Sequence, residues 1–188
     1  MRHKYATEAI VLGRSPLGEA SSLVSLLTSE LGLVRARAQG VRKPGAKLSA
    51  ALTTLAQSDV ILLRGKEGWR LSGAILAHDY FTDLAPDARE RAGRVANLML
   101  RLVTDSGGGE IYELFKEYLE ILPTLADEEQ DAAETLAALY LLQDAGLDAG
   151  EQVPQTDGHF GNAAREYALA KRKDLITRVN RGIEASGL

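Results

Sequence analysis

The sequence predicts an α+β fold in which a five-stranded barrel is followed by a helical bundle. Up to about residue 80, short β-rich runs alternate with glycine-containing and charged turns, whereas beyond residue 80 apolar residues recur at helical spacing. The charge changes at the same place. Residues 1–80 carry 11 Lys and Arg against 6 Asp and Glu, and residues 81–188 carry 11 against 20. We therefore expect two domains, 1–80 and 81–188.

Five short runs supply the predicted strands. They are Ala9–Leu12, Leu23–Thr28, Leu33–Ala38, Val60–Leu63 and Trp69–Ala77. Gly13–Gly18 predicts a loop after the first run, and Arg64–Gly68 predicts the turn of a hairpin between the last two. One longer excursion, Val41–Ala56, separates the third strand from the fourth. Five antiparallel strands with this spacing fit a small Greek-key barrel of the OB type.

The first two helices of the bundle are predicted after residue 85. Proline suits a first helical turn, so the first helix is expected to start at Pro86. Its apolar residues keep helical spacing until the stretch Ser106–Gly109 stops the run. A second helix is expected over Ile111–Leu122, and Pro123 ends it.

Two further helices complete the predicted bundle. A third is expected where Asp127 and Gln130 resemble a capping box, and Gly146 closes it. A final helix is expected to start near Asn162. Its apolar side is predicted to carry Tyr167, Ile176, Val179 and Ile183. The apolar sides of these helices would together form one core.

Composition excludes several classes of protein and site. The chain has no cysteine, so it has no disulfide framework, no thiolate nucleophile and no cysteine-ligated metal site. Met1–Lys4 is basic, but the apolar run Ala9–Leu12 is far too short for a signal peptide or a spanning helix. We therefore expect a soluble, cytoplasmic protein without a membrane partner.

Motifs for catalysis are not found. Gly13–Glu19 has two glycines at the separation of a phosphate-binding loop, but Glu19 stands where that loop needs lysine, and a carboxylate there would repel phosphates. Four glutamates step along the second helix at positions that a solvated helix face explains: Glu110, Glu113, Glu117 and Glu120. The three histidines are scattered. We therefore predict no enzyme, no catalytic residue, no metal and no cofactor.

Basic residues form the more informative pattern. Arg35 and Arg37 alternate with small or apolar residues, so they share one face of the third strand. The excursion after that strand adds Arg42, Lys43 and Lys47, and Arg14 lies in the first predicted loop. A positive groove of this kind suits a nucleic-acid backbone, although a basic solvated rim would give the same pattern. Because Trp69 is the only aromatic residue inside a predicted barrel strand between Tyr5 and Tyr80, contacts to phosphate are expected to dominate.

Several ordered segments also match a known family. They are the opening strand Ala9–Leu12, the turn at Gly18-Glu19, the strand that ends in Thr28-Ser29-Glu30-Leu31-Gly32, and the basic run Ala38–Lys43 followed by Lys47-Leu48. In this order and spacing, over residues 5–80, the chain resembles the N-terminal region of bacterial RecO recombination mediators. The helical remainder agrees in kind.

The resemblance implies a non-enzymatic DNA-repair factor. RecO-like proteins join an OB barrel to a helical domain, bind single- and double-stranded DNA and promote annealing of complementary strands. With RecR they help RecA displace single-strand-binding protein. The expected partners are therefore DNA and RecR, with single-strand-binding protein as a further candidate. DNA contact is implied for Arg35, Arg37, Arg42, Lys43 and Lys47, with Arg14 as an additional candidate.

The sequence departs from the family in two respects. Many members carry a zinc-binding cysteine cluster after the helix that corresponds to Thr135–Ala145, but Gly150–Pro154 holds no cysteine, so metal binding is not expected. Residues 81–157 carry 5 basic and 17 acidic residues, which argues against a DNA surface across the helical domain. Two alternatives stay open: an OB barrel that serves as a protein-interaction adaptor, and an RNA-binding module of the OB type.

Overall fold

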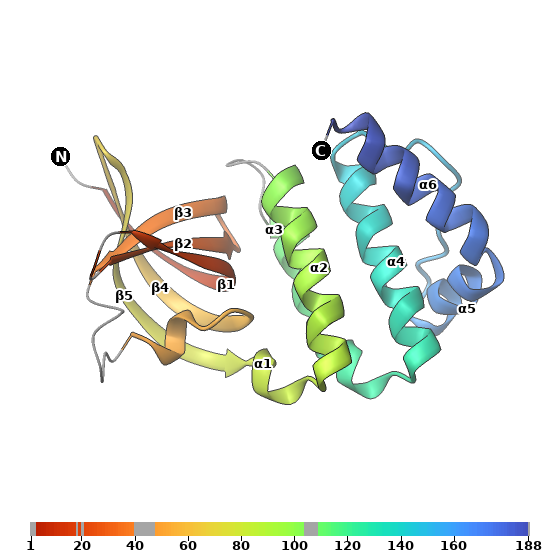
Figure 1. Cartoon of the computed structure of the whole chain (residues 1–188), viewed down its shortest axis with the longest axis horizontal. Helices are drawn as coiled ribbons and strands as arrows, with labels where there is room; N and C mark the ends of the chain where they lie inside the picture. Colours follow the sequence, from red (N-terminus) through yellow and green to blue (C-terminus); the bar gives the residue numbers. More distant parts are fainter. Residues whose placement is uncertain (1–2, 18, 20, 40–47, 104–108, 188) are drawn as a thin grey trace. The chain divides into compact units, whose positions relative to one another are not determined.

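A computed structural model describes residues 3–17, 19, 21–39, 48–103 and 109–187, and it has the predicted order of strands followed by helices (Figure 1). The strands are β1 (His3–Leu17), β2 (Ser21–Thr28), β3 (Gly32–Gln39), β4 (Ala56–Gly65) and β5 (Gly68–Asp79). The α-helices are α1 (Tyr80–Asp83), α2 (Pro86–Leu102), α3 (Gly109–Ile121), α4 (Asp127–Asp144), α5 (Asn162–Ala170) and α6 (Arg172–Ala185). Two 3-10 turns, η1 (Ala50–Leu52) and η2 (Leu122–Thr124), lie between them. The α+β fold class is confirmed.

The five strands close a barrel in the order β1-β2-β3-β5-β4. Neighbouring strands are antiparallel except for β3 and β5, which run parallel and pair only at Ala36 with Trp69 and at Arg37 with Arg70. β1 is long enough to serve two neighbours, because its first part pairs with β4 and its second part with β2. This closed order of five short strands is that of a small OB-type barrel.

The barrel interior is filled by the inward-facing residue of every second strand position. The alternation is clearest in β3, where Val34, Ala36 and Ala38 are buried and the residues between them are exposed. The buried cluster comprises Ala9, Val11, Val24, Leu26, Val34, Ala36, Ala38, Leu52, Ala56, Val60, Leu62 and Leu71. Aliphatic residues of moderate size suit the interior of a narrow barrel.

The loop predicted at Gly13–Gly18 is wrong for Gly13–Leu17, which continues β1. The strand register shifts between Val11 and Gly13, and pairing with β2 then continues from Gly13 to Leu17. A β-bulge of this kind lets a strand bend and still keep its partner. The local glycine and proline therefore mark an irregular strand, and a phosphate-binding loop is excluded there.

The first two predicted helices are close to those observed. α2 starts at Pro86, as the sequence predicts, and α3 is followed by a 3-10 turn that contains Pro123. Between α2 and α4, the guanidinium of Arg91 donates hydrogen bonds to Asp127 at 2.8 Å and to Asp131 at 2.8 and 3.0 Å. This nearly buried arginine is satisfied by two carboxylates, so it joins the two helices without an unpaired charge.

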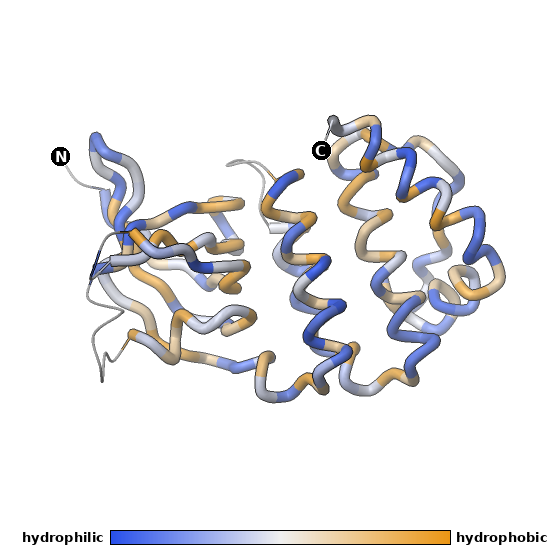
Figure 2. Tube along the Cα trace, in the orientation of Figure 1, coloured by the Kyte–Doolittle hydropathy of each residue, from blue (hydrophilic) through white to orange (hydrophobic). Residues whose placement is uncertain are grey.

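The cap of α4 lies one residue before the predicted one. Ala126 is the N-cap, and its backbone N–H donates to the Glu129 carboxylate at 3.3 Å. The prediction of Asp127 and Gln130 as the capping pair is therefore wrong, because Gln130 instead donates to the carbonyls of Leu122 and Leu125. Figure 2 shows α4 as hydrophilic in its first turns and hydrophobic further along.

The single final helix predicted from Asn162 is two helices, which are separated at Lys171. The non-helical backbone of Lys171 changes the direction of the chain, so the side that faces the core also changes. Ala164, Ala168 and Leu175 are buried, whereas Ile176 is 39% exposed. The prediction that Ile176 lies on the apolar side is therefore wrong, because one helical period does not hold across residues 162–185.

The chain separates into two compact units. One comprises Met1–Asp83 and Thr104–Glu113, and the other comprises Leu84–Val103 and Leu114–Leu188. The first turn of α3 thus belongs with the strands. The domain division 1–80 and 81–188 remains our proposal for the functional parts of the chain. Among the described residues, no helix combines the length and the apolar character needed to cross a bilayer.

The barrel core yields a stability prediction that Trp69, the one tryptophan of the chain, can report by its fluorescence. We expect Leu26→Ala, at a fully buried position, to lower the free energy of unfolding of the barrel by about 2–5 kcal/mol in a urea titration. Ile75→Ala is the control, because Ile75 is 72% exposed and its truncation should cost less than about 1 kcal/mol. Equal effects of both changes would contradict the assignment of Leu26 to the core.

Candidate functional site

The predicted basic face of the third strand is present on β3. Arg35 and Arg37 are exposed, and they alternate with the buried residues Val34, Ala36 and Ala38. Cross-strand partners in a sheet share a face, so Arg35 lies in line with Ser25 and Arg37 in line with Leu23 of β2. The two arginines therefore project from the outside of the barrel.

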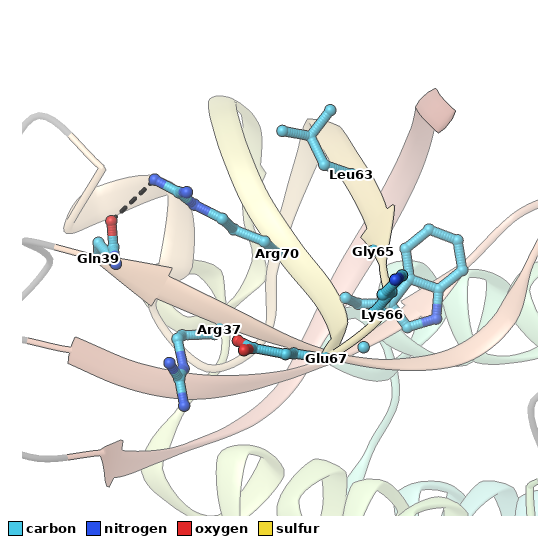
Figure 3. A pocket seen from close by; sticks show the side chains of 9 residues that line it. Arg37, Gln39, Leu63, Gly65, Lys66, Glu67 and Arg70 are labelled. Atoms are coloured by element: carbon cyan, nitrogen blue, oxygen red, sulfur yellow. Dashed lines mark hydrogen bonds between the residues drawn. The ribbon is translucent and has the colours of Figure 1, made fainter. Parts of the chain in front are cut away.

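Barrel closure brings a third arginine to this face. Arg37 and Arg70 are register partners in the parallel β3–β5 pair. The Arg70 guanidinium donates a hydrogen bond to Oε1 of Gln39 at 2.8 Å (Figure 3). A neutral amide orients this guanidinium without cancelling its charge. Two arginines that are distant in the sequence thus occupy neighbouring positions on adjacent strands.

The β4–β5 hairpin adds further charge beside these arginines. A hollow of about 450 Å³ is lined by β3, β4 and β5 together with the turn of the hairpin (Figure 3). Among the described residues, its charged lining consists of Arg37, Lys66 and Arg70 with the acidic Glu67. In an OB barrel, the face of the second and third strands and the loop between the fourth and fifth are the usual surface for oligonucleotides. The hollow lies where this surface is expected.

The aromatic residue of the site is held by its neighbours. The guanidinium carbon of Arg64 lies 4.8 Å from the centroid of the Trp69 ring, and Tyr5 meets the same ring edge-on at 5.2 Å. A cation over the face of an indole is attracted to it, so both contacts restrain Trp69. The ring supports the hollow, and its stacked arginine adds positive charge. This surface therefore presents mainly positive charge to a ligand.

The basic row extends around the barrel beyond the hollow. Arg70 is the register partner of Leu63, and Leu63 is the register partner of Lys4 on β1. Lys4 and Arg70 are both exposed and share this outer face with Arg37. The row crosses four strands and suits a ligand with repeated negative charges, such as a phosphate backbone.

The structure brings together only some of the residues that the sequence singled out. Arg35 and Arg37 share the outer face of β3. Arg14 is exposed, but its register partner is Val24, so strand alternation assigns it to the opposite face. Arg42, Lys43 and Lys47 lie outside the described residues. Their contact with DNA stays a prediction.

Sequence reasoning missed Arg64, Lys66 and Arg70 as part of the site. Arg64–Gly68 predicts a hairpin turn, but no local pattern connects its charges with Arg37. The strand order of an OB barrel contained the missing signal, because it places the fifth strand next to the third. Once that order is applied, the hairpin and the basic face of β3 become neighbours.

Comparison with known proteins identifies the family of the chain. The family described as "Recombination protein O N terminal" matches residues 1–79. A protein from Heliobacterium modesticaldum named "DNA repair protein RecO" is 30% identical over 182 residues, which cover 86% of this chain and 66% of that protein. The chain belongs to the RecO family. Its membership confirms the family resemblance seen in the N-terminal motifs.

Other relatives of the same name support the membership. The RecO of a Synechocystis species is 32% identical over 142 residues, which are 74% of this chain and 52% of that protein. The RecO of Dehalococcoides mccartyi strain BAV1 is 45% identical over 64 residues, which are 34% of this chain and 25% of that protein. The chain thus spans between a quarter and two thirds of the length of these RecO proteins.

The glutamates of α3 do not form a catalytic or metal cluster. Glu117 accepts a hydrogen bond from the Phe160 backbone at 3.3 Å, and its other oxygen lies 2.7 Å from Nδ1 of His159. Glu117 is thus a structural partner of the segment before α5, and the interpretation of a purely solvated helix face is wrong for it. Within the described residues, no group of three or more His, Asp or Glu is arranged to hold a metal.

The positive charge around Trp69 can be measured by collisional quenching. Iodide should quench Trp69 more strongly than a neutral quencher does, because the surrounding cations concentrate anions. Arg37→Gln with Arg70→Gln should lower the iodide quenching constant about twofold, whereas Glu67→Gln should raise it. Both differences should vanish near 1 M salt, where the screening length is only about 3 Å. Equal quenching in all variants at low salt would contradict a positive hollow.

Proposed function

We propose that this RecO family member is a non-enzymatic DNA-repair and recombination mediator whose barrel binds single- and double-stranded DNA. The observation that carries the proposal is the register of Arg37 with Arg70 beside the basic β4–β5 hairpin. This arrangement places adjacent cations on the surface that OB barrels use for oligonucleotides. The names of the relatives, which describe DNA repair and recombination proteins, agree with it.

The geometry favours contacts with the phosphate backbone. Arginine forks match phosphate oxygens, and Arg37, Arg70 and Lys66 line one hollow. Trp69 is already flanked by Arg64 and Tyr5, so base stacking on it has little room. Binding of this kind carries little sequence preference and leaves base edges accessible. The basic residues after β3, Arg42, Lys43 and Lys47, are proposed to extend the same contact.

This binding mode supplies a mechanism for strand annealing. Two complementary strands repel each other through their phosphates, and cations that neutralise part of this charge lower the repulsion. A strand held by its backbone can still pair through its bases. We propose that the protein promotes annealing in this way, and that with RecR it helps RecA replace single-strand-binding protein on DNA in the cytoplasm. A contact with single-strand-binding protein itself is a further part of this proposal.

The salt dependence of DNA binding tests the proposed site. If three to five phosphates are neutralised, the logarithm of the binding constant should fall against the logarithm of salt with a slope of about −2 to −4, from about 0.7 per contact on a single strand. Arg37→Glu with Arg70→Glu should reduce the magnitude of this slope by about one to two. Fluorescence anisotropy of a labelled single-stranded oligonucleotide measures both quantities.

A charge reversal outside the barrel separates the site from the overall charge. Arg101→Glu changes an exposed cation at the end of α2 by the same amount per residue. It should leave the slope unchanged. If the Arg37 and Arg70 variant keeps the wild-type slope, the DNA site lies elsewhere. If a matched RNA oligomer binds more tightly than DNA, the RNA-binding alternative replaces the mediator proposal.

Annealing tests the activity beyond binding. Complementary oligonucleotides that carry a donor and an acceptor dye should anneal faster with the wild-type protein than without it. The Arg37→Glu and Arg70→Glu variant should return the rate nearly to the spontaneous value, because it no longer lowers the repulsion between strands. DNA binding without any acceleration would reduce the protein to a binding module and contradict the mediator function.

A further inference from the structure

A second surface of the barrel has the opposite charge. A hollow of about 470 Å³ lies over β1, β4 and β5 and is lined on its apolar side by Ala6, Val60, Ile61, Gly73 and Ile75. Ile75 is 72% exposed, more than any other large apolar residue among those described. Isolated exposed residues are ordinary, but an exposed isoleucine inside a hollow offers an anchoring site for an apolar side chain.

Three carboxylates border this apolar patch. Glu8, Asp59 and Ile75 are register partners on adjacent strands, so they form one row across the barrel. Glu30, in the turn after β2, completes the acidic lining, and none of the described lysines and arginines lines the hollow. The barrel half of the chain has six acidic residues, and three of them gather here. The acidic row thus lies four residues along β1 and β4 from the basic row of Lys4, Leu63 and Arg70.

Hydrogen bonds fix one end of the row. The hydroxyl of Tyr112 donates to Oε2 of Glu8 at 2.9 Å, and Nε2 of Gln57 donates to the same oxygen at 3.3 Å. Burial is the main cause that raises the pKa of Tyr112, and the hydrogen bond with the Glu8 carboxylate raises it further. The phenol therefore stays protonated and remains the hydrogen-bond donor. The Thr7 and Ser29 hydroxyls are 3.0 Å apart and join β1 to the turn that carries Glu30. The acidic end of the hollow is therefore preorganised.

These features exclude two kinds of ligand. Carboxylates repel phosphates, so DNA is not attracted to this face. The three carboxylates lie along the hollow and do not converge on one point, and among the described residues they form no group fit for a metal. An apolar anchor between separate negative charges matches a peptide that alternates basic and apolar side chains.

We propose that the hollow of Glu8, Glu30, Asp59, Ile61 and Ile75 is a docking site for an extended basic segment of a protein partner. An apolar side chain of the segment packs on Ile61 and Ile75, and its lysines or arginines pair with Glu30 and Asp59. Side chains on one face of an extended chain recur about every 7 Å, close to the roughly 5–10 Å that separate neighbouring and next-neighbouring strands. The site shares no lining residue with the arginine hollow and does not depend on DNA binding.

Three synthetic ten-residue peptides provide the probes. One alternates lysine with valine, one alternates glutamate with valine, and one alternates lysine with serine. The labelled lysine–valine peptide is expected to bind the full chain at least about tenfold more tightly than either of the others. Binding of the lysine–serine peptide with equal affinity would show that the apolar patch is not used, and would overturn the proposal.

Variants at the hollow locate the binding. We expect Ile75→Ser to weaken binding of the lysine–valine peptide about tenfold. The double variant Glu30→Gln with Asp59→Asn should weaken it by a similar factor. Glu166→Gln neutralises an exposed carboxylate on α5 and should have no effect. All these positions are exposed, and the fluorescence of Trp69 checks that each barrel is folded. Equal weakening by Glu166→Gln would attribute the binding to overall charge and overturn the site.

Two further measurements distinguish this proposal from others. Ile75→Ser should keep wild-type affinity for single-stranded DNA, so a failure of the peptide test leaves the DNA proposal intact. Sedimentation equilibrium should show the same mass for wild type and Ile75→Ser. If wild type dimerises and Ile75→Ser abolishes the dimer, a second copy of the chain occupies the hollow, and the proposal of a different protein partner is wrong.

Discussion

The short parallel pairing of β3 with β5 is the constraint on which the candidate site depends. Only Ala36 with Trp69 and Arg37 with Arg70 join the two strands, yet these pairs close the barrel. Closure buries Ala36 in the core and at the same time makes Arg37 and Arg70 neighbours in the register on the outside. Like charges on neighbouring strand positions repel, and the repulsion is tolerable because both side chains are exposed to water, where it is weak. An anion bound at this face would reduce the repulsion, so the fold itself favours an anionic ligand here.

Much of the fold follows from local sequence patterns, and much of the site does not. Alternation in Leu33–Ala38 predicts the outward arginines, and Pro86 predicts the start of α2, because both signals act within a few residues. The predictions that are wrong concern features that depend on residues farther along the chain. Gly13–Leu17 is a strand because β2 pairs with it, and Ile176 is exposed because Lys171 interrupts the helix.

Charge is distributed unevenly around a barrel whose strands carry both signs. The outer face of β3 and the β4–β5 hairpin bear the arginines, and the outer face over β1, β4 and β5 bears Glu8 and Asp59. A narrow barrel leaves little room for charges inside, so strand alternation places most of them outward. The order of the strands then decides which charges become neighbours. One small domain can in this way present two surfaces with opposite preferences.

The length of β1 also determines how the barrel can assemble. His3 pairs with Arg64, whereas the second part of the same strand pairs with β2, its immediate successor in the chain. The hairpin of β1 and β2 can therefore form early. The first residues of β1 can pair only after β4 has been synthesised, about sixty residues later. During synthesis this edge stays unpaired, and unpaired edges invite pairing with other chains. The exposed residues His3 and Lys4 at that edge keep it polar until β4 arrives.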